Sequence, residues 1–64
     1  MKDLYSSFLL AIRTQFNADG SLYLYADLDG FRYGQCYREP KQAQERFISF
    51  YFPHYQRDYA SNFI

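Results

Sequence analysis

Apolar and polar residues follow a helical spacing at the start of the chain. Between residues 3 and 17 the apolar positions recur every three or four residues, and polar side chains occupy the other side. This period predicts an amphipathic helix over 3–17 that is capped by Asp3. We expect it to end within 17–20, because Asn17 or Gly20 can adopt the left-handed conformation that closes many helices. The apolar positions are Leu4, Tyr5, Phe8, Leu9, Ile12 and Phe16.

The spacing of apolar residues changes to every second position in the next part of the chain. Two alternating segments flank the dipeptide Asp29-Gly30. Asp-Gly between such segments is typical of a two-residue hairpin turn, because both central positions of the favoured turn have positive φ. We therefore predict an antiparallel β-hairpin with strands over 21–28 and 31–38.

The length of the hairpin loop decides which side chains share a face. A two-residue loop places Asp27 opposite Arg32, an attractive pair, and the ring of Tyr25 over Gly34, which has no side chain. A three-residue loop with a bulge at Gly30 would place charged and small residues beside the leucines, which makes a poorer core. We therefore adopt the two-residue loop. Its core face holds Leu22, Leu24, Ala26, Leu28, Phe31, Tyr33, Gln35 and Tyr37, and its outer face holds Tyr23, Tyr25, Asp27, Arg32, Gly34, Cys36 and Arg38.

Helical spacing returns after the hairpin. Glu39-Pro40 ends the second strand, and proline is favoured at the first position of a helix because its missing N–H is not needed there. We predict a second amphipathic helix over 40–52 and expect Pro53 to break it or to start a third element. The tail, 53–64, is compatible with a short C-terminal helix that folds back or docks on a neighbour. The apolar stripes are Ala43, Phe47, Phe50 and Tyr51 in the helix, and Phe52, Tyr55, Tyr59 and Phe63 toward the tail.

These elements predict one small α+β domain with the order helix, β-hairpin, helix, in which both amphipathic helices pack on one face of the antiparallel hairpin. A chain of 64 residues supports a single domain. A core of this size supplies a net stability of only a few kcal/mol. We expect self-association or a binding partner to add to it.

Charge and cysteine content narrow the classes of function. Seven basic and seven acidic residues give a formal net charge of zero, so no long-range field attracts a nucleic acid or an acidic membrane. The single Cys36 excludes an intramolecular disulfide. No apolar run has the length of a signal segment or a membrane span. We therefore expect a cytoplasmic protein that does not bind membranes.

The chain carries few groups for catalysis or metal binding. His54 is the single histidine and has no second metal ligand at a suitable spacing. Cys36 has no base, second cysteine or helix N-terminus placed to activate its thiol. Asp19, Asp27 and Asp29 fit turns better than a calcium loop, which needs a regular series of oxygen ligands. We predict no enzymatic activity, no metal site and no cofactor.

Aromatic residues point instead to an interaction surface. Eight tyrosines and seven phenylalanines exceed what so small a domain can bury. On the outer face of the hairpin, Tyr23 and Tyr25 combine with Arg32 and Arg38, which are residue types enriched at binding hot spots. We predict that these four residues bind a partner protein or a second copy of the chain, through the face or an edge of the hairpin. The alternative is that the tail covers these rings, using Tyr55, Tyr59 and Phe63.

Nucleic-acid binding through the same face is the second hypothesis. The segment from Phe31 to Ala43, a strand followed by a helix that begins near a proline and an alanine, resembles the sheet-reading DNA-binding domains of the phage-integrase arm and plant AP2 types. The resemblance implies contact between a sheet face and DNA. Those families use a three-stranded basic sheet, whereas we count two strands, two outward arginines and zero net charge. The form that remains is stacking of single-stranded bases on Tyr23 and Tyr25.

Overall fold

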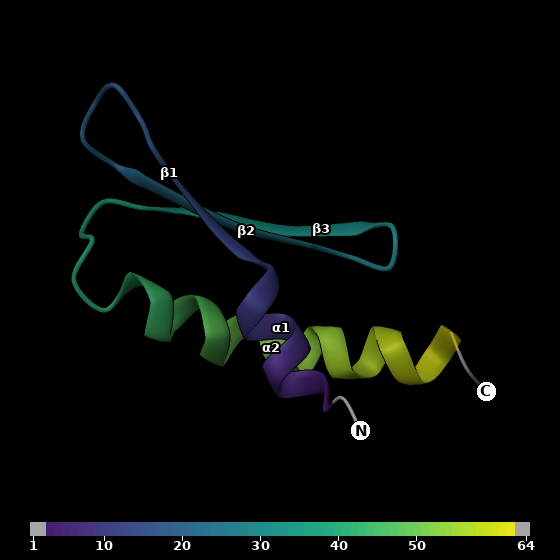
Figure 1. Cartoon of the computed structure of the whole chain (residues 1–64). Coiled ribbons are helices and arrows are strands. Elements are labelled where there is room, and N and C mark those ends of the chain that lie inside the picture. Colours follow the sequence, from purple (N-terminus) through teal and green to yellow (C-terminus); the bar gives the residue numbers. More distant parts are fainter. Residues whose placement is uncertain (1–2, 63–64) are drawn as a thin grey trace.

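Two helices lie on one face of a three-stranded antiparallel sheet (Figure 1). The computed structural model describes residues 3–62. The sheet has the strand order β1-β2-β3. The protein is thus a small α+β domain with the predicted order of helix, hairpin and helix. Its elements are α1 (Leu4–Ala11), β1 (Ile12–Phe16), β2 (Leu22–Leu28), β3 (Phe31–Tyr37) and α2 (Ala43–Asn62).

The β2–β3 hairpin has the predicted two-residue loop. Asp29 and Gly30 have φ values of 53° and 83°, so both central residues of the turn have positive φ. The register runs from Leu28 opposite Phe31 at the loop to Leu22 opposite Tyr37 at the open end. Asp27 and Arg32 are directly opposite, as the sequence indicates. The strand bounds differ from the prediction by one residue at the ends remote from the loop.

The first helix is shorter than predicted, and the prediction of two strands was wrong. α1 ends at Ala11, and β1 occupies residues 12–16, which the sequence analysis assigned to the helix over 3–17. An apolar residue at every fourth position satisfies both the helical period and the strand period of two, and Phe8, Ile12 and Phe16 have this spacing. Pairing with β2 selects the strand. The turn between them is closed by the Asn17 N–H, which donates to the Ser21 carbonyl over 2.9 Å.

The second helix begins at Ala43 and not at the predicted Pro40, and it extends further than predicted. α2 runs from Ala43 to Asn62 as one helix that contains Pro53, so the expected break at residue 53 and the separate tail were wrong. Proline removes one backbone hydrogen bond of a helix interior. Here the buried side of the helix continues past it, because Phe47 before Pro53 and Tyr55 after it both belong to the core. Burial of the second half outweighs the lost hydrogen bond.

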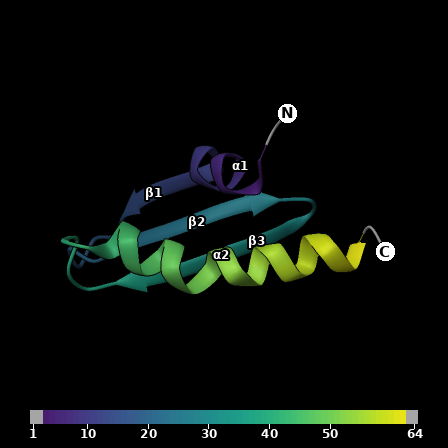
Figure 2. The same ribbon diagram turned by 90° about the horizontal axis from the view of Figure 1, so that it is seen from below.

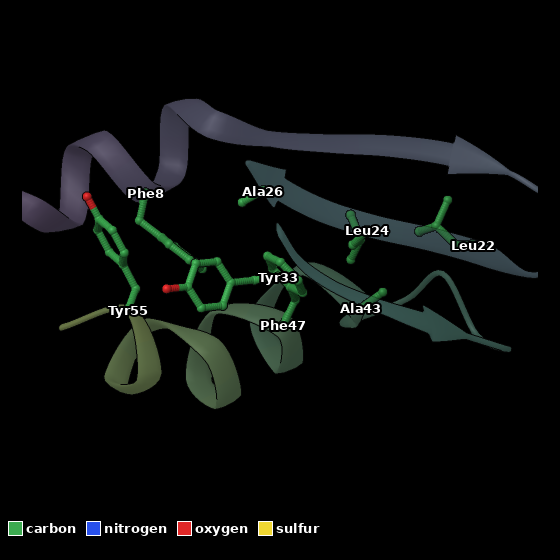
Figure 3. Packing of buried hydrophobic residues seen from close by; sticks show 8 residues of the cluster. All are labelled: Phe8, Leu22, Leu24, Ala26, Tyr33, Ala43, Phe47 and Tyr55. Atoms are coloured by element: carbon green, nitrogen blue, oxygen red, sulfur yellow. The ribbon is translucent and has the colours of Figure 1, made fainter. Parts of the chain in front are cut away.

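The core lies between the sheet and the helices (Figure 3). The Phe8 ring of α1 is fully buried and stacks against Phe47 and Tyr55 of α2, with 5.7 Å between ring centroids in both pairs. The Tyr33 hydroxyl donates to Asp58 Oδ2 over 2.6 Å. α2 contacts β2 and β3, while α1 leads directly into β1 (Figure 2). The buried residues are Phe8, Leu22, Leu24, Ala26, Tyr33, Ala43, Phe47 and Tyr55.

Candidate functional site

The outer face of the sheet is the side opposite the helices, and no described element covers it (Figure 1). Tyr55 lies in the core on the other side, and Tyr59 packs against that core. The described part of the tail therefore does not cover the outer rings. Phe63, the third residue expected to cover them, lies outside the described residues. The outer face carries Arg13 and Gln15 of β1, Tyr23, Tyr25 and Asp27 of β2, and Arg32, Gly34 and Cys36 of β3.

Two tyrosine rings form the centre of this face. Tyr23 and Tyr25 of β2 are stacked, with 5.3 Å between ring centroids and 21° between ring planes. Both side chains are half-buried although no helix covers them. Their neighbours on the sheet therefore shield part of each ring, and the remaining ring surface is open to a partner.

Gly34 makes room for the ring of Tyr23. A Cβ atom added to Gly34 would lie 2.9 Å from Cζ of Tyr23 and would overlap its hydroxyl oxygen. The sequence analysis placed Tyr25 over this glycine, and that detail was wrong. Tyr25 is directly opposite Gly34, but its ring lies under the guanidinium of Arg32 instead. The ring of Tyr23, the diagonal neighbour, occupies the space.

Arg32 is held by two interactions at once. Its Nε and Nη2 donate to the two carboxylate oxygens of Asp27 over 2.7 and 3.0 Å, and its Cζ lies 4.6 Å from the centroid of the Tyr25 ring. The hydrogen bond with Asp27 raises the pKa of Arg32 and lowers the pKa of Asp27. Both side chains are more than half exposed, so this ion pair adds little to stability. Its effect is to fix the guanidinium over the ring.

Two further arginines, Arg13 and Arg38, lie near this face. Arg13 of β1 is directly opposite Tyr25, is exposed, and makes no ion pair within residues 3–62. Arg38 follows β3 and lines a shallow pocket together with the turn residues Asp19, Gly20 and Ser21. Among the four predicted anchors, Tyr25 thus contacts both Tyr23 and Arg32, and Arg38 lies beyond the end of the strand.

Sequence reasoning missed Arg13 and Gln15. Both were assigned to the solvent side of a helix, whereas β1 places them on the outer face beside the tyrosines. The signal that could have found them is the alternation of residues 12–16, in which Ile12, Thr14 and Phe16 fall on one side and Arg13 and Gln15 on the other. We call Tyr23, Tyr25, Arg32, Arg13 and Gln15 the tyrosine face.

Groups suited to catalysis or metal binding are sparse in the described structure. Cys36 is exposed on β3, opposite Tyr23. Within residues 3–62 no three His, Cys, Asp or Glu side chains gather as metal ligands would. His54 Nδ1 lies 2.8 Å from the Phe50 carbonyl within α2. A carbonyl can only accept, so in this contact Nδ1 carries the proton and donates.

Neither of the described helices is long and apolar enough to cross a membrane. A groove of about 540 Å³ lies between α1, the β2–β3 turn and α2, and Asp29 is the one carboxylate among the described residues of its wall. Comparison with protein-family models, with curated proteins and with solved structures finds no match to this chain.

Proposed function

We propose that this protein is a small non-enzymatic interaction module that binds a partner protein through the tyrosine face. The observation that carries the proposal is that both helices pack on the inner face, which leaves two stacked tyrosines and a fixed guanidinium uncovered on the outer face. Tyrosine and arginine are enriched among the residues that dominate binding energy.

The geometry favours binding because the face is already ordered. Tyr23 and Tyr25 restrain each other by stacking, and Asp27 fixes Arg32 over the second ring. Side chains that are immobile before binding lose less conformational entropy when a partner arrives. We infer a partner segment that places an apolar or aromatic side chain on the two rings.

Arg13 suggests the charge of that segment. It is the arginine of the tyrosine face that has no ion pair within residues 3–62, since Arg32 is neutralised by Asp27. An acidic residue beside the apolar side chain would complement it. An exposed, unpaired thiol at Cys36 suits a reducing compartment, and we propose that the protein acts in the cytoplasm.

A capture experiment from a lysate of the source cells tests the proposal. The immobilised wild type is compared with Tyr25→Ser and with the control Phe50→Ser, which removes an exposed aromatic ring from α2 on the other side of the sheet. We expect a protein that the wild type and Phe50→Ser retain and that Tyr25→Ser loses. Capture of the same proteins by the wild type and both variants would refute a role for the tyrosine face.

Single-stranded nucleic acid is the second candidate ligand. The third strand favours it, because β1 adds Arg13 to a face on which two stacked rings are open. Bases stack on aromatic side chains with about 1–3 kcal/mol per base. Titration with an oligothymidylate at two salt concentrations distinguishes the candidates. Oligonucleotide binding that weakens steeply with salt would support nucleic acid as the ligand, because contacts with phosphates depend on salt. If the oligonucleotide does not bind, the protein partner is supported instead.

A further inference from the structure

The free edge of β1 is a second surface with the features of an interface. We propose that two copies of the chain associate by antiparallel pairing of their β1 strands around a twofold axis at Thr14, which joins the two sheets into one sheet of six strands. This goes beyond the proposed function, because it uses a sheet edge and leaves the tyrosine face of each copy uncovered.

Backbone geometry shows which groups of β1 are unpaired. The hydrogen bond from Asn17 to Ser21 sets the phase of the β1–β2 ladder, in which hydrogen-bonded pairs alternate with non-bonded ones. Arg13 and Gln15 therefore turn their backbone groups toward β2, and Thr14 turns its groups to the free edge. Phe16 also turns its backbone groups to the free edge, and Ile12 turns its carbonyl there. The Ile12 N–H donates to the Leu9 carbonyl of α1. No hydrogen bond within residues 3–62 reaches the outward groups of Thr14 or Phe16.

The opposite edge of the sheet is protected. Gly34 of β3 is a non-bonded partner of Tyr25 in the hairpin, so its backbone groups turn away from β2. The Tyr51 hydroxyl of α2 donates to the Gly34 carbonyl over 2.9 Å. A side chain from the long helix thus covers the middle of the β3 edge. Exposed edges invite pairing with another chain. Among the described residues, no side chain bonds the outward backbone groups of β1 in this way.

The sequence of β1 indicates that the strand which pairs with this edge is β1 of a second copy. Centred on Thr14, the pairing joins each outward backbone position to another: Thr14 to Thr14, and Ile12 to Phe16. The Phe16 side chain is 73% exposed in the monomer and would lie against Ile12 of the second copy. Aromatic with β-branched and threonine with threonine are favourable cross-strand pairs.

Charge selects this register over its neighbours. Arg13 is the one charged residue of β1, and it would lie opposite the neutral Gln15 of the second copy. A register centred on Arg13 would set two guanidinium groups directly opposite each other, which is unfavourable. A register centred on Gln15 would leave Ile12 without a partner. The strand thus complements itself best around Thr14.

Size sets the strength of the association. A stable interface buries about 800 Å² on each partner, which is more than pairing along a five-residue strand provides. We therefore expect a dimer that forms at micromolar concentration and dissociates on dilution. Because both tyrosine faces lie on the same side of the joined sheet, the dimer would present them side by side to a partner with two matching segments.

Sedimentation velocity on a dilution series tests this arrangement. Thr14→Pro removes an N–H that the monomer does not use, and proline is tolerated at such positions of edge strands. The wild type is expected to shift from dimer to monomer on dilution, and Thr14→Pro to remain monomeric with an unchanged circular dichroism spectrum. Phe16→Ser keeps every backbone group and provides a second variant if Thr14→Pro does not fold. It should weaken the dimer about tenfold or more.

Three further variants test which surface and which register the dimer uses. Tyr25→Ser should dimerise like the wild type, so loss of partner capture with an intact dimer separates the two proposals. In a Cys36→Ser background, Thr14→Cys should form a disulfide dimer, because the two Cα atoms would lie about 5.5 Å apart. Gln15→Cys should not. A wild type that stays monomeric near 1 mM, a dimer unaffected by both Thr14→Pro and Phe16→Ser, or a dimer abolished by Tyr25→Ser would overturn the proposal.

Discussion

Tyr25 lies at the centre of the side-chain interactions on the outer face. Its ring stacks on Tyr23, lies under the guanidinium of Arg32 and is directly opposite Arg13 on the next strand. Tyr23 in turn fills the space above Gly34. Removal of one of these side chains is therefore expected to change the position of the others. The surface also depends on the absence of a side chain at residue 34, which leaves room for the Tyr23 ring.

Gly34→Ala is expected to disturb the tyrosine face more than the fold. The new Cβ would overlap the Tyr23 hydroxyl, which is the far end of a flexible side chain, so the ring can swing away. We expect a loss of unfolding free energy of about 1 kcal/mol in urea and a clear change in the near-ultraviolet dichroism of the tyrosines. In a Tyr23→Ala background the substitution should have almost no effect. An equal loss of stability in both backgrounds would contradict the contact.

Tyr33 should limit stability at high pH. Burial, together with the nearby Asp58 carboxylate, raises the pKa of Tyr33 above its usual value of about 10. A group whose pKa is higher in the folded state stabilises the fold fully below its unfolded pKa, and this contribution is lost as the pH rises through the folded pKa. We expect absorbance at 295 nm to show tyrosinate forming well above pH 10, together with unfolding.

The control for this titration is Tyr33→Phe. It removes the hydroxyl that donates to Asp58, so stability at pH 7 should fall by about 1 kcal/mol while the decline above pH 10 becomes shallower. Tyr37 and Tyr55, whose pKa values are also raised by burial, remain in the variant and account for the residual late titration. An unchanged alkaline decline would assign the effect to those two residues instead.

At the scale of elements, structure that depends on neighbouring residues could be predicted from the sequence. Structure that depends on contacts between remote residues could not. The β2–β3 hairpin follows from Asp29-Gly30 and the alternation around it, so its loop and register could be derived from neighbouring residues. β1 has a sequence compatible with helix and strand, and its state is decided by pairing with β2. The tyrosine face was therefore predicted for β2 and β3, and its β1 side, Arg13 and Gln15, was missed.

The course of α2 illustrates the same limit. Pro53 is a strong local signal for a helix end, and the sequence therefore predicts one there. The structure continues the helix because Tyr55 is buried against Phe8 and Tyr33, which are remote in the sequence. The stabilisation that comes from burying Tyr55 cannot be inferred from the residues around Pro53.

Pro53→Ala should stabilise the protein. Alanine restores the N–H that can donate to the carbonyl of Ser49, and Pro53 is exposed, so no packing is lost. Relative to alanine, proline costs about 3 kcal/mol in an exposed helix interior, and we expect a gain of about 1–3 kcal/mol in urea unfolding. Ser49→Ala, at an exposed position one turn earlier, serves as the control. A loss of stability in Pro53→Ala would mean that the proline itself supports the packing of α2 on the sheet.

At the scale of the whole molecule, the two faces of the sheet have different roles. The inner face carries the core around Phe8 and the two described helices, whereas no described helix lies on the outer face, where the tyrosine face is exposed. A domain of this size has little stability in excess, so aromatic side chains left outside the core require an explanation. Partner binding by the outer face and pairing at the β1 edge together provide one.

The most direct test compares two free energies for Tyr25→Ser. Titration calorimetry with the captured partner gives the change in binding, and urea unfolding gives the change in stability. We predict that affinity falls by about 30-fold or more, equivalent to about 2 kcal/mol, while unfolding free energy falls by about 1 kcal/mol or less. Equal losses in binding and in stability would contradict the account and would make Tyr25 a structural residue of the sheet.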